Sequence, residues 1–188
     1  MRRVAAALDT GPASLYVYVA GREGLLQAML DRIFASVELE TPDRARWRAQ
    51  LHELLQRIRR TLIAHPGIAA TAVAEPPGTD AAFRLMENLL GILLAGGLDP
   101  RNAAWAADIL STVVSHAAIE AEVRGSDHQE QARRLHDIFS GLPAERFPLI
   151  TAHAAQLVEG DADERFHVAV DVVVDGMLAR TAPPTKGL

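Results

Sequence analysis

Apolar residues repeat with the period of an α-helix through most of this chain, and short Gly-, Pro- and Asp-containing stretches interrupt the repeat. In residues 80–95 the large apolar side chains in helical phase are Phe83, Met86, Leu89, Leu90 and Leu93. Gly96-Gly97 ends this stretch, and Asp99-Pro100 then supplies an N-cap residue and a proline suited to the first helical turn. No strand-like alternation of any length occurs. The pattern therefore predicts an all-α fold.

The same reasoning divides the whole chain into helices. We expect them at about residues 2–8, 12–18, 22–37, 43–64, 80–95, 100–123, 131–140, 144–158 and 163–180. The chain has 188 residues, of which 49% are apolar and only 5% are aromatic, so its core is expected to consist mostly of Leu, Ile, Val and Ala.

Several classes of protein are excluded. No apolar run is long enough to span a membrane, and Asp9 interrupts the short apolar stretch that would otherwise suggest a signal peptide. The absence of Cys excludes disulfides and thiolate metal sites, and is consistent with a cytoplasmic protein. We find no HExxH motif, no Gly-rich phosphate loop and no Ser/His/Asp spacing. The sequence therefore predicts no enzyme activity, no catalytic residues, no metal and no cofactor.

Positive charge is concentrated towards the N-terminus. Residues 1–60 carry ten Arg and seven Asp or Glu, a net charge of +3, whereas residues 61–188 carry nine Lys or Arg and 17 Asp or Glu, a net charge of −8. This asymmetry is compatible with an N-terminal region that faces DNA, on an acidic body. The alternative is that the charge varies along the chain without any functional reason.

The first 18 residues have the plan of a helix-turn-helix. A short helix at 2–8 and a second at 12–18 flank the turn Asp9-Thr10-Gly11. In this motif the second helix lies in the major groove of DNA, where its N-terminal and outward side chains reach base edges and phosphates.

The stretch RRVAAALDTGPASLYVYVAGREGLLQAMLD, residues 2–31, closely resembles the DNA-binding region of the tetracycline repressor (TetR) family of bacterial transcription regulators. HPG at 65–67, RFPLI at 146–150 and DERFHVAVDVVVDGM at 163–177 are similar to the ligand-binding domain of that family. The resemblance implies a helix-turn-helix DNA-binding region at 1–40 and a helical ligand-binding and dimerisation domain at 41–182.

The resemblance also implies which residues contact DNA. They are Arg2, Pro12, Ala13, Ser14, Tyr16, Tyr18 and Arg22. Tyr16 matches the family's phosphate-contacting tyrosine, and Tyr18 matches a ring that also reaches DNA. Arg22 matches a basic residue at the start of the next helix, where a cation and the helix N-terminus can hold one phosphate together. The alternative for both tyrosines is packing at the edge of a small core. For Arg2 and Arg22 the alternative is a solvated arginine on the surface that binds nothing.

A pocket between the helices of the second domain would bind a small inducer of unknown identity. The residues expected to line it are Phe83, Met86, Trp105, His116 and Phe147, with ordinary core packing as the alternative for each. His116 and Glu120 share one helical face because they are four residues apart. Helices 100–123 and 163–180 resemble the family's four-helix dimer interface, and small residues such as Ala169 and Gly176 would let the helix axes approach closely.

The sequence departs from the family at its start, because members usually carry a further helix before the motif. We therefore expect Val4, Leu8, Leu15 and Leu25 to lose part of their cover, which would loosen the N-terminal region. The function implied is a ligand-responsive regulator, most simply a repressor released by its inducer from a near-palindromic double-stranded DNA operator. The alternative is a helical dimeric ligand-binding or interaction module that has lost DNA binding.

Overall fold

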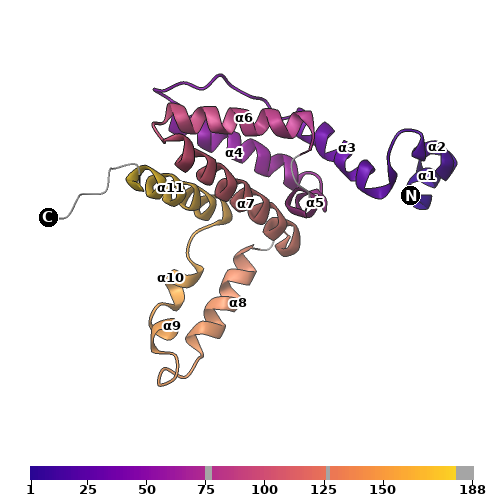
Figure 1. Cartoon of the computed structure of the whole chain (residues 1–188). Coiled ribbons are helices and arrows are strands. Elements are labelled where there is room, and N and C mark those ends of the chain that lie inside the picture. Colours follow the sequence, from indigo (N-terminus) through magenta and orange to yellow (C-terminus); the bar gives the residue numbers. More distant parts are fainter. Residues whose placement is uncertain (75–77, 126–127, 181–188) are drawn as a thin grey trace.

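The computed structural model describes residues 1–74, 78–125 and 128–180, and these residues contain helices and no strand (Figure 1). The helices are α1 (Arg2–Ala7), α2 (Pro12–Tyr16), α3 (Gly21–Ala35), α4 (Trp47–Ile63), α5 (Ile68–Ala74), α6 (Asp80–Ala95), α7 (Pro100–Arg124), α8 (His128–Ser140), α9 (Pro148–Ala152), α10 (Ala154–Val158) and α11 (Ala162–Arg180). The all-α prediction is confirmed. No helix within these ranges is both long and apolar enough to cross a membrane.

Helices α6 and α7 begin where the sequence pattern places them, because side chains satisfy their first N–H groups. Thr79 Oγ1 accepts a hydrogen bond from the N–H of Ala82 at the start of α6. Asp99 accepts hydrogen bonds from the N–H groups of Arg101 and Asn102, both at 3.0 Å, and Pro100 occupies the first position of α7.

Three predicted helices differ from the structure. The second helix ends at Tyr16 rather than residue 18, and the N–H of Tyr18 donates to the carbonyl of Leu15, only three residues back. The fourth begins at Trp47 rather than residue 43, because residues 43–46 form a turn in which the Asp43 carboxylate accepts the N–H of Ala45. The stretch 144–158 is not one helix, since the backbone of His153 leaves the helical region (φ −115°, ψ 21°) and separates α9 from α10.

Helices α3 to α7 and α11 share one apolar core, which we call the body. Helix α7 crosses its centre and packs against α4, α5, α6 and α11, while α3 packs against α4, α5 and α6. Leu30, Ile33 and Val37 belong to this core although they precede residue 40, where the sequence places a domain boundary. The C-terminal half of α3 is thus part of the body.

Two smaller parts extend from the body (Figure 1). The first, which we call the head, is residues 1–20; its helices α1 and α2 lie at the far end of α3. The second, the arm, is residues 128–158; its helices α8, α9 and α10 pack on one another and project away from the ends of α7 and α11. Gly125 precedes the arm in the chain and Gly160 follows it, and they have positive φ values of 64° and 83°.

Candidate functional site

The turn of the head is built on Asp9, which has a φ of 49°. The N–H of Thr10 donates to the carbonyl of Ala5 at 3.0 Å, and the N–H of Asp9 donates to Ala6 at 3.3 Å. This is the pattern in which a left-handed residue ends a helix and satisfies its last carbonyls, and Asp tolerates that conformation better than most residues. Gly11 is extended instead and serves as the N-cap of α2.

The turn presents α2 with its polar residues outward. Leu15 and Val19 are half-buried, whereas Tyr16 and Tyr18 are 56% and 85% exposed. The alternative in which both rings pack at the edge of a core is therefore wrong for Tyr18, and Tyr16 also presents most of its surface to solvent. Ala13 and Ser14 are exposed, and Pro12 occupies the first position of α2.

Arg22 lies directly after a tight turn that starts α3. The N–H of Gly21 donates to the Val19 carbonyl at 2.9 Å, and Gly21 has a φ of 78°, which favours glycine. Arg22 and Arg2 are both exposed, each in the first turn of its helix. Within the described residues neither arginine makes an ion pair or a side-chain hydrogen bond, so both guanidinium groups are available to an external anion.

A pocket of about 170 Å³, which we call the inner cavity, lies between α3 and the neighbouring helices of the body. Helix α3 contributes Gln27, Leu30 and Phe34 to its wall, α4 contributes Leu55, Ile58 and Leu62, and α6 and α7 supply most of the remainder, including Met86 and Ser115. None of the described lining residues carries a charge. The few polar groups come from Gln27, Thr79, Ser111 and Ser115, a composition typical of small-molecule sites.

The structure does not gather the five expected pocket residues at this cavity. Met86 lines it, but Phe83 is 56% exposed, because α6 turns Ala82, Leu85, Met86 and Leu89 towards the cavity. Trp105 lies on the surface, with Arg101 and Arg180 over its ring. His116 lines a different cavity, and Phe147 is the N-cap of α9 in the arm. Helical phase alone does not distinguish these positions.

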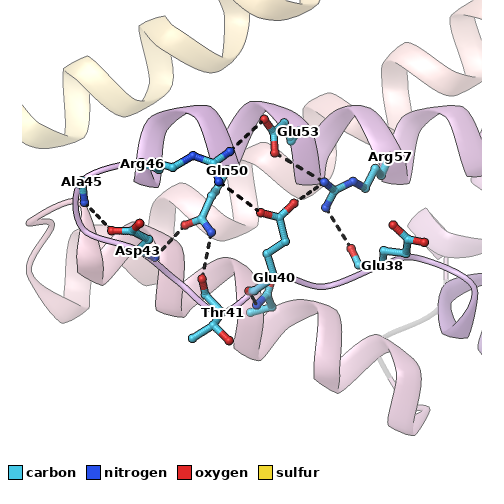
Figure 2. Close-up of polar contacts among 10 residues, drawn as sticks. Glu38, Glu40, Thr41, Asp43, Ala45, Arg46, Gln50, Glu53 and Arg57 are labelled. Atoms are coloured by element: carbon cyan, nitrogen blue, oxygen red, sulfur yellow. Dashed lines mark hydrogen bonds and ion pairs between the residues drawn. The ribbon is translucent and has the colours of Figure 1, made fainter.

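A polar network fixes the segment that leads from α3 to α4, as Figure 2 shows. Arg57 donates hydrogen bonds to the Glu40 carboxylate and, at 3.2 Å, to the Glu38 carbonyl. The buried amide of Gln50 donates to the Thr41 carbonyl and accepts from the N–H of Asp43. The hydrogen bond from Arg57 lowers the pKa of Glu40. These partners lie 7 to 19 residues apart, and the sequence analysis did not identify them.

A second set of polar contacts joins α4 to α11. Arg48 donates to Asp171 at 3.0 Å and to Asp175 at 2.6 Å, and His52 Nε2 lies 3.0 Å from the Asp171 carboxylate. Burial would raise the pKa of Asp171, but the hydrogen bonds from His52 and Arg48 outweigh it and lower that pKa. Helix α4 is thus tied to the linking segment at one side and to α11 at the other.

The architecture is an exposed helix-turn-helix, a plan that DNA-binding proteins use, at the end of a helix that lines an uncharged cavity. The sequence profile of the tetracycline repressor-like C-terminal domain matches residues 41–181, and the chain therefore belongs to the TetR family. Within the described residues, no group of three or more His, Asp or Glu is arranged to hold a metal ion.

Relatives with assigned names agree with this family. The chain is 30% identical to an HTH-type transcriptional regulator of Saccharopolyspora erythraea, covering 70% of this chain and 55% of that protein. It is 32% identical to the HTH-type transcriptional repressor DrrR1 of Streptomyces coeruleorubidus, covering 71% of this chain and 48% of the repressor. The chain thus matches about half the length of these curated relatives.

Solved structures also agree. The crystal structure of the TetR family protein ActR of Streptomyces coelicolor with actinorhodin has a TM-score of 0.88 and 34% identity to this chain, covering 97% of it and 88% of ActR. Apo ActR has a TM-score of 0.85 at the same identity and coverage. The resemblance therefore extends through the head as well as the body.

Proposed function

We propose that this protein is a ligand-responsive DNA-binding transcriptional regulator that acts as a repressor. The relatives with names of this kind support the proposal, and one structural observation carries it. Helix α3 runs from Arg22, beside the exposed head, to Gln27, Leu30 and Phe34 in the wall of the inner cavity. One uninterrupted helix therefore connects the candidate DNA contacts to the candidate ligand site.

On DNA, α2 would enter the major groove. Ser14 would hydrogen-bond a base edge or a phosphate, Ala13 would contact a thymine methyl group, and the Tyr16 and Tyr18 hydroxyls would donate to phosphates. The side chain of Pro12 lies outside the part of the chain that the structure describes. Arg22 would hold a phosphate together with the N-terminus of α3, and Arg2 would do so at the start of α1.

The inner cavity favours an uncharged, largely apolar ligand. A charged group buried against these walls would lose its hydration without gaining a counter-ion. The volume of about 170 Å³ holds a single ring. A larger ligand has to displace part of the wall, and α3 is one of the helices that form it. Displacement of α3 would move the head and thereby lower the affinity for DNA.

The proposed repressor is a two-fold dimer built on α7 and α11. These helices pack side by side, and each exposes an apolar pair one turn apart, Trp105 with Ile109 and Val168 with Val172. Of the small residues expected at the interface, Ala169 lines a cavity, whereas Gly176 is exposed with open space around it. A dimer of this kind would place two heads on half-sites about one DNA turn apart, in a near-palindromic operator.

Binding to DNA can be tested without knowing the operator. Duplexes selected from a random pool would be titrated with the protein at several salt concentrations. We expect selection of a near-palindrome and an affinity that falls steeply with salt, because phosphate contacts release counter-ions. A folded dimer that enriches no sequence would contradict the proposal and favour an interaction module without DNA binding.

Point variants locate the contact. Tyr18→Ala and Arg22→Ala should each weaken operator binding by roughly tenfold, corresponding to about 1.4 kcal/mol. Arg22→Ala should also reduce the salt dependence by roughly one phosphate contact. Phe83→Ala removes another exposed ring, on α6, and should leave DNA binding unchanged. Equal effects of the Tyr18 and Phe83 changes would show that the head is not the contact surface.

Filling the inner cavity tests the proposed binding of a ligand there. Ser115→Phe should preserve DNA binding and abolish release by ligand. Actinorhodin and (S)-DNPA, which the ActR structures contain, are the first compounds to test. Release of the Ser115→Phe protein at the same ligand concentration as the natural protein would place the ligand elsewhere.

A further inference from the structure

A side chain of α3 completes the start of α6. The carboxylate of Asp31 accepts a hydrogen bond from the N–H of Ala81 at 3.0 Å, across 50 residues of sequence. The first N–H groups of a helix have no partner within that helix, and the local cap, Thr79 Oγ1, accepts from Ala82 instead. Asp31 thus supplies an acceptor that α6 does not provide for itself, and its negative charge suits a helix N-terminus.

This contact lies at the edge of the inner cavity. On α3, Asp31 follows Leu30 and lies about one turn before Phe34, and both of these residues line the cavity. On α6, the cap before the helix and the residue that follows Ala81 line it as well. The hydrogen bond therefore joins the same two stretches of helix that face each other across the cavity. A molecule that pushes α3 away from α6 has to stretch it.

The C-terminal end of α3 is fixed. Ile33 and Val37 are buried in the core, and the contacts drawn in Figure 2 hold the segment that leads on to α4. Helix α6 holds that segment too, because the Asn88 side chain donates to the Glu40 carbonyl at 2.8 Å. A force from the cavity therefore tilts α3 about its C-terminal end and does not shift the helix as a whole.

The half of α3 that leads to the head is held less firmly. None of its residues from Gly21 to Met29 is buried, whereas Leu30 and Ile33 are. Asp31 lies where the two halves meet, at about 15 Å from the start of the helix. A tilt of about 10° at that point would move the start of α3 by roughly 3 Å. The hydrogen bond at Asp31 thus restrains the position of the head.

We propose that Asp31 is the positioning residue that couples the inner cavity to the head, a role that rests on the proposed function. While its hydrogen bond to Ala81 is intact, α3 holds the head in the position that fits the operator. A ligand in the inner cavity separates α3 from α6, breaks this bond and lets α3 tilt. Because DNA favours the closed contact and the ligand favours the open one, each weakens the binding of the other.

Two substitutions separate positioning from a merely structural role. Asp31→Leu removes the acceptor but keeps a strong helix former in α3, whereas Asp31→Asn removes the same charge and keeps an acceptor oxygen. Without ligand, Asp31→Leu should bind the selected operator at least roughly fivefold more weakly than the natural protein. Asp31→Asn should stay within about twofold of the natural protein, because its amide oxygen restores the contact.

Binding of a probe should change in the opposite direction. Phenylnaphthylamine is an uncharged aromatic molecule whose fluorescence rises in apolar surroundings, and Ser115→Phe identifies the part of its binding that belongs to the inner cavity. Asp31→Leu should bind this probe roughly fivefold more tightly than the natural protein, because no hydrogen bond has to be broken first. General damage to the fold would instead weaken the binding of both operator and probe.

Amide exchange reports on the contact itself. In Asp31→Leu the amide of Ala81 should exchange roughly tenfold faster, while the amide of Ala82, which Thr79 caps, should change little. Asp31→Ala replaces Asp31→Leu if that variant unfolds.

An unchanged operator affinity in Asp31→Leu would overturn the proposal, and so would operator and probe affinities that fall together. An Asp31→Asn protein that behaves like Asp31→Leu would overturn it as well. A natural protein that selects no operator would contradict the proposed function itself, so the two failures are distinguishable.

Discussion

Among the described side chains of the head, Ala5 alone is buried, whereas in the body Leu51, Leu54, Leu55 and Leu93 are almost completely removed from solvent. The head is shaped by backbone hydrogen bonds around Asp9 and Gly21, and its helices have no side-chain caps. The body has a continuous apolar core, and Thr79 and Asp99 cap two of its long helices.

The difference indicates that the head and the body contribute differently to the stability of the fold. Burial of apolar surface supplies most of the free energy of folding, so the body sets the stability of the chain, and the head opens locally at low cost. On the proposed function, a head of this kind adapts to a DNA groove while the body keeps its shape. Four changes test this contrast, in order of decreasing effect.

Truncation of core leucines should separate head and body most clearly. Leu93→Ala should lower the free energy of unfolding by about 2–5 kcal/mol, because it leaves a cavity in a fully buried site. Leu8→Ala, in the head, removes a side chain that is 63% exposed and should change it by less than about 0.5 kcal/mol. Urea unfolding followed by circular dichroism measures both. Similar losses would mean that the head shares the body's core.

Close packing in the body predicts that a side chain at Gly96 is destabilising. A Cβ on Gly96 would lie 2.5 Å from Cε3 of Trp47, so Gly96→Ala should cost about 1–3 kcal/mol. Gly24, near the start of α3, is the matched control, since a Cβ there would be 3.5 Å from its nearest neighbour, Ala20. Gly24→Ala should be neutral or stabilising by up to about 1 kcal/mol. The two melting temperatures should therefore move in different directions, and a common shift would refute the packing argument.

The pH dependence of stability tests the polar contacts between α4 and α11. The lowered pKa of Asp171 means that its ionised form stabilises the folded state. That contribution is present above the unfolded-state value of about 4 and is lost as the pH falls through the lower folded-state value.

Asp171→Asn should therefore flatten the loss of stability below about pH 4, with a difference at neutral pH of less than about 1 kcal/mol because the pair is partly exposed. An Asp171→Asn curve with the natural slope would show that this carboxylate contributes nothing.

A new cap should strengthen the head by a small amount. Gly11 is the extended N-cap of α2, and a Cβ there meets no atom within 4 Å. Gly11→Ser should stabilise α2 by about 0.5 kcal/mol, which slows amide exchange in residues 13–16 roughly twofold. Amides of α7 in the same sample should exchange at unchanged rates. Faster exchange in α2 would show that Ser does not cap this helix.

Local signals predicted much of the fold, and long-range contacts account for what they missed. Helices α6 and α7 were predictable because the apolar stripe of residues 80–95, the Gly residues after it and the cap Asp99 are neighbours in sequence. The family resemblance implied that Tyr18 faces outward, and its side chain is 85% exposed. The inner cavity was not predictable, since Met86 and Phe83 share one apolar stripe and only packing decides which faces inward. The network around Glu40 and Arg57 likewise depends on how α3 and α4 meet.

Amide hydrogen exchange of the intact protein, without and with its selected operator, tests the central claim most directly. The account predicts that residues 1–20 exchange far faster than α7 and α11 in the free protein, and that the operator slows exchange mainly at residues 10–22. A head that is protected as strongly as α11 without DNA, or an operator that protects only the body, would contradict it.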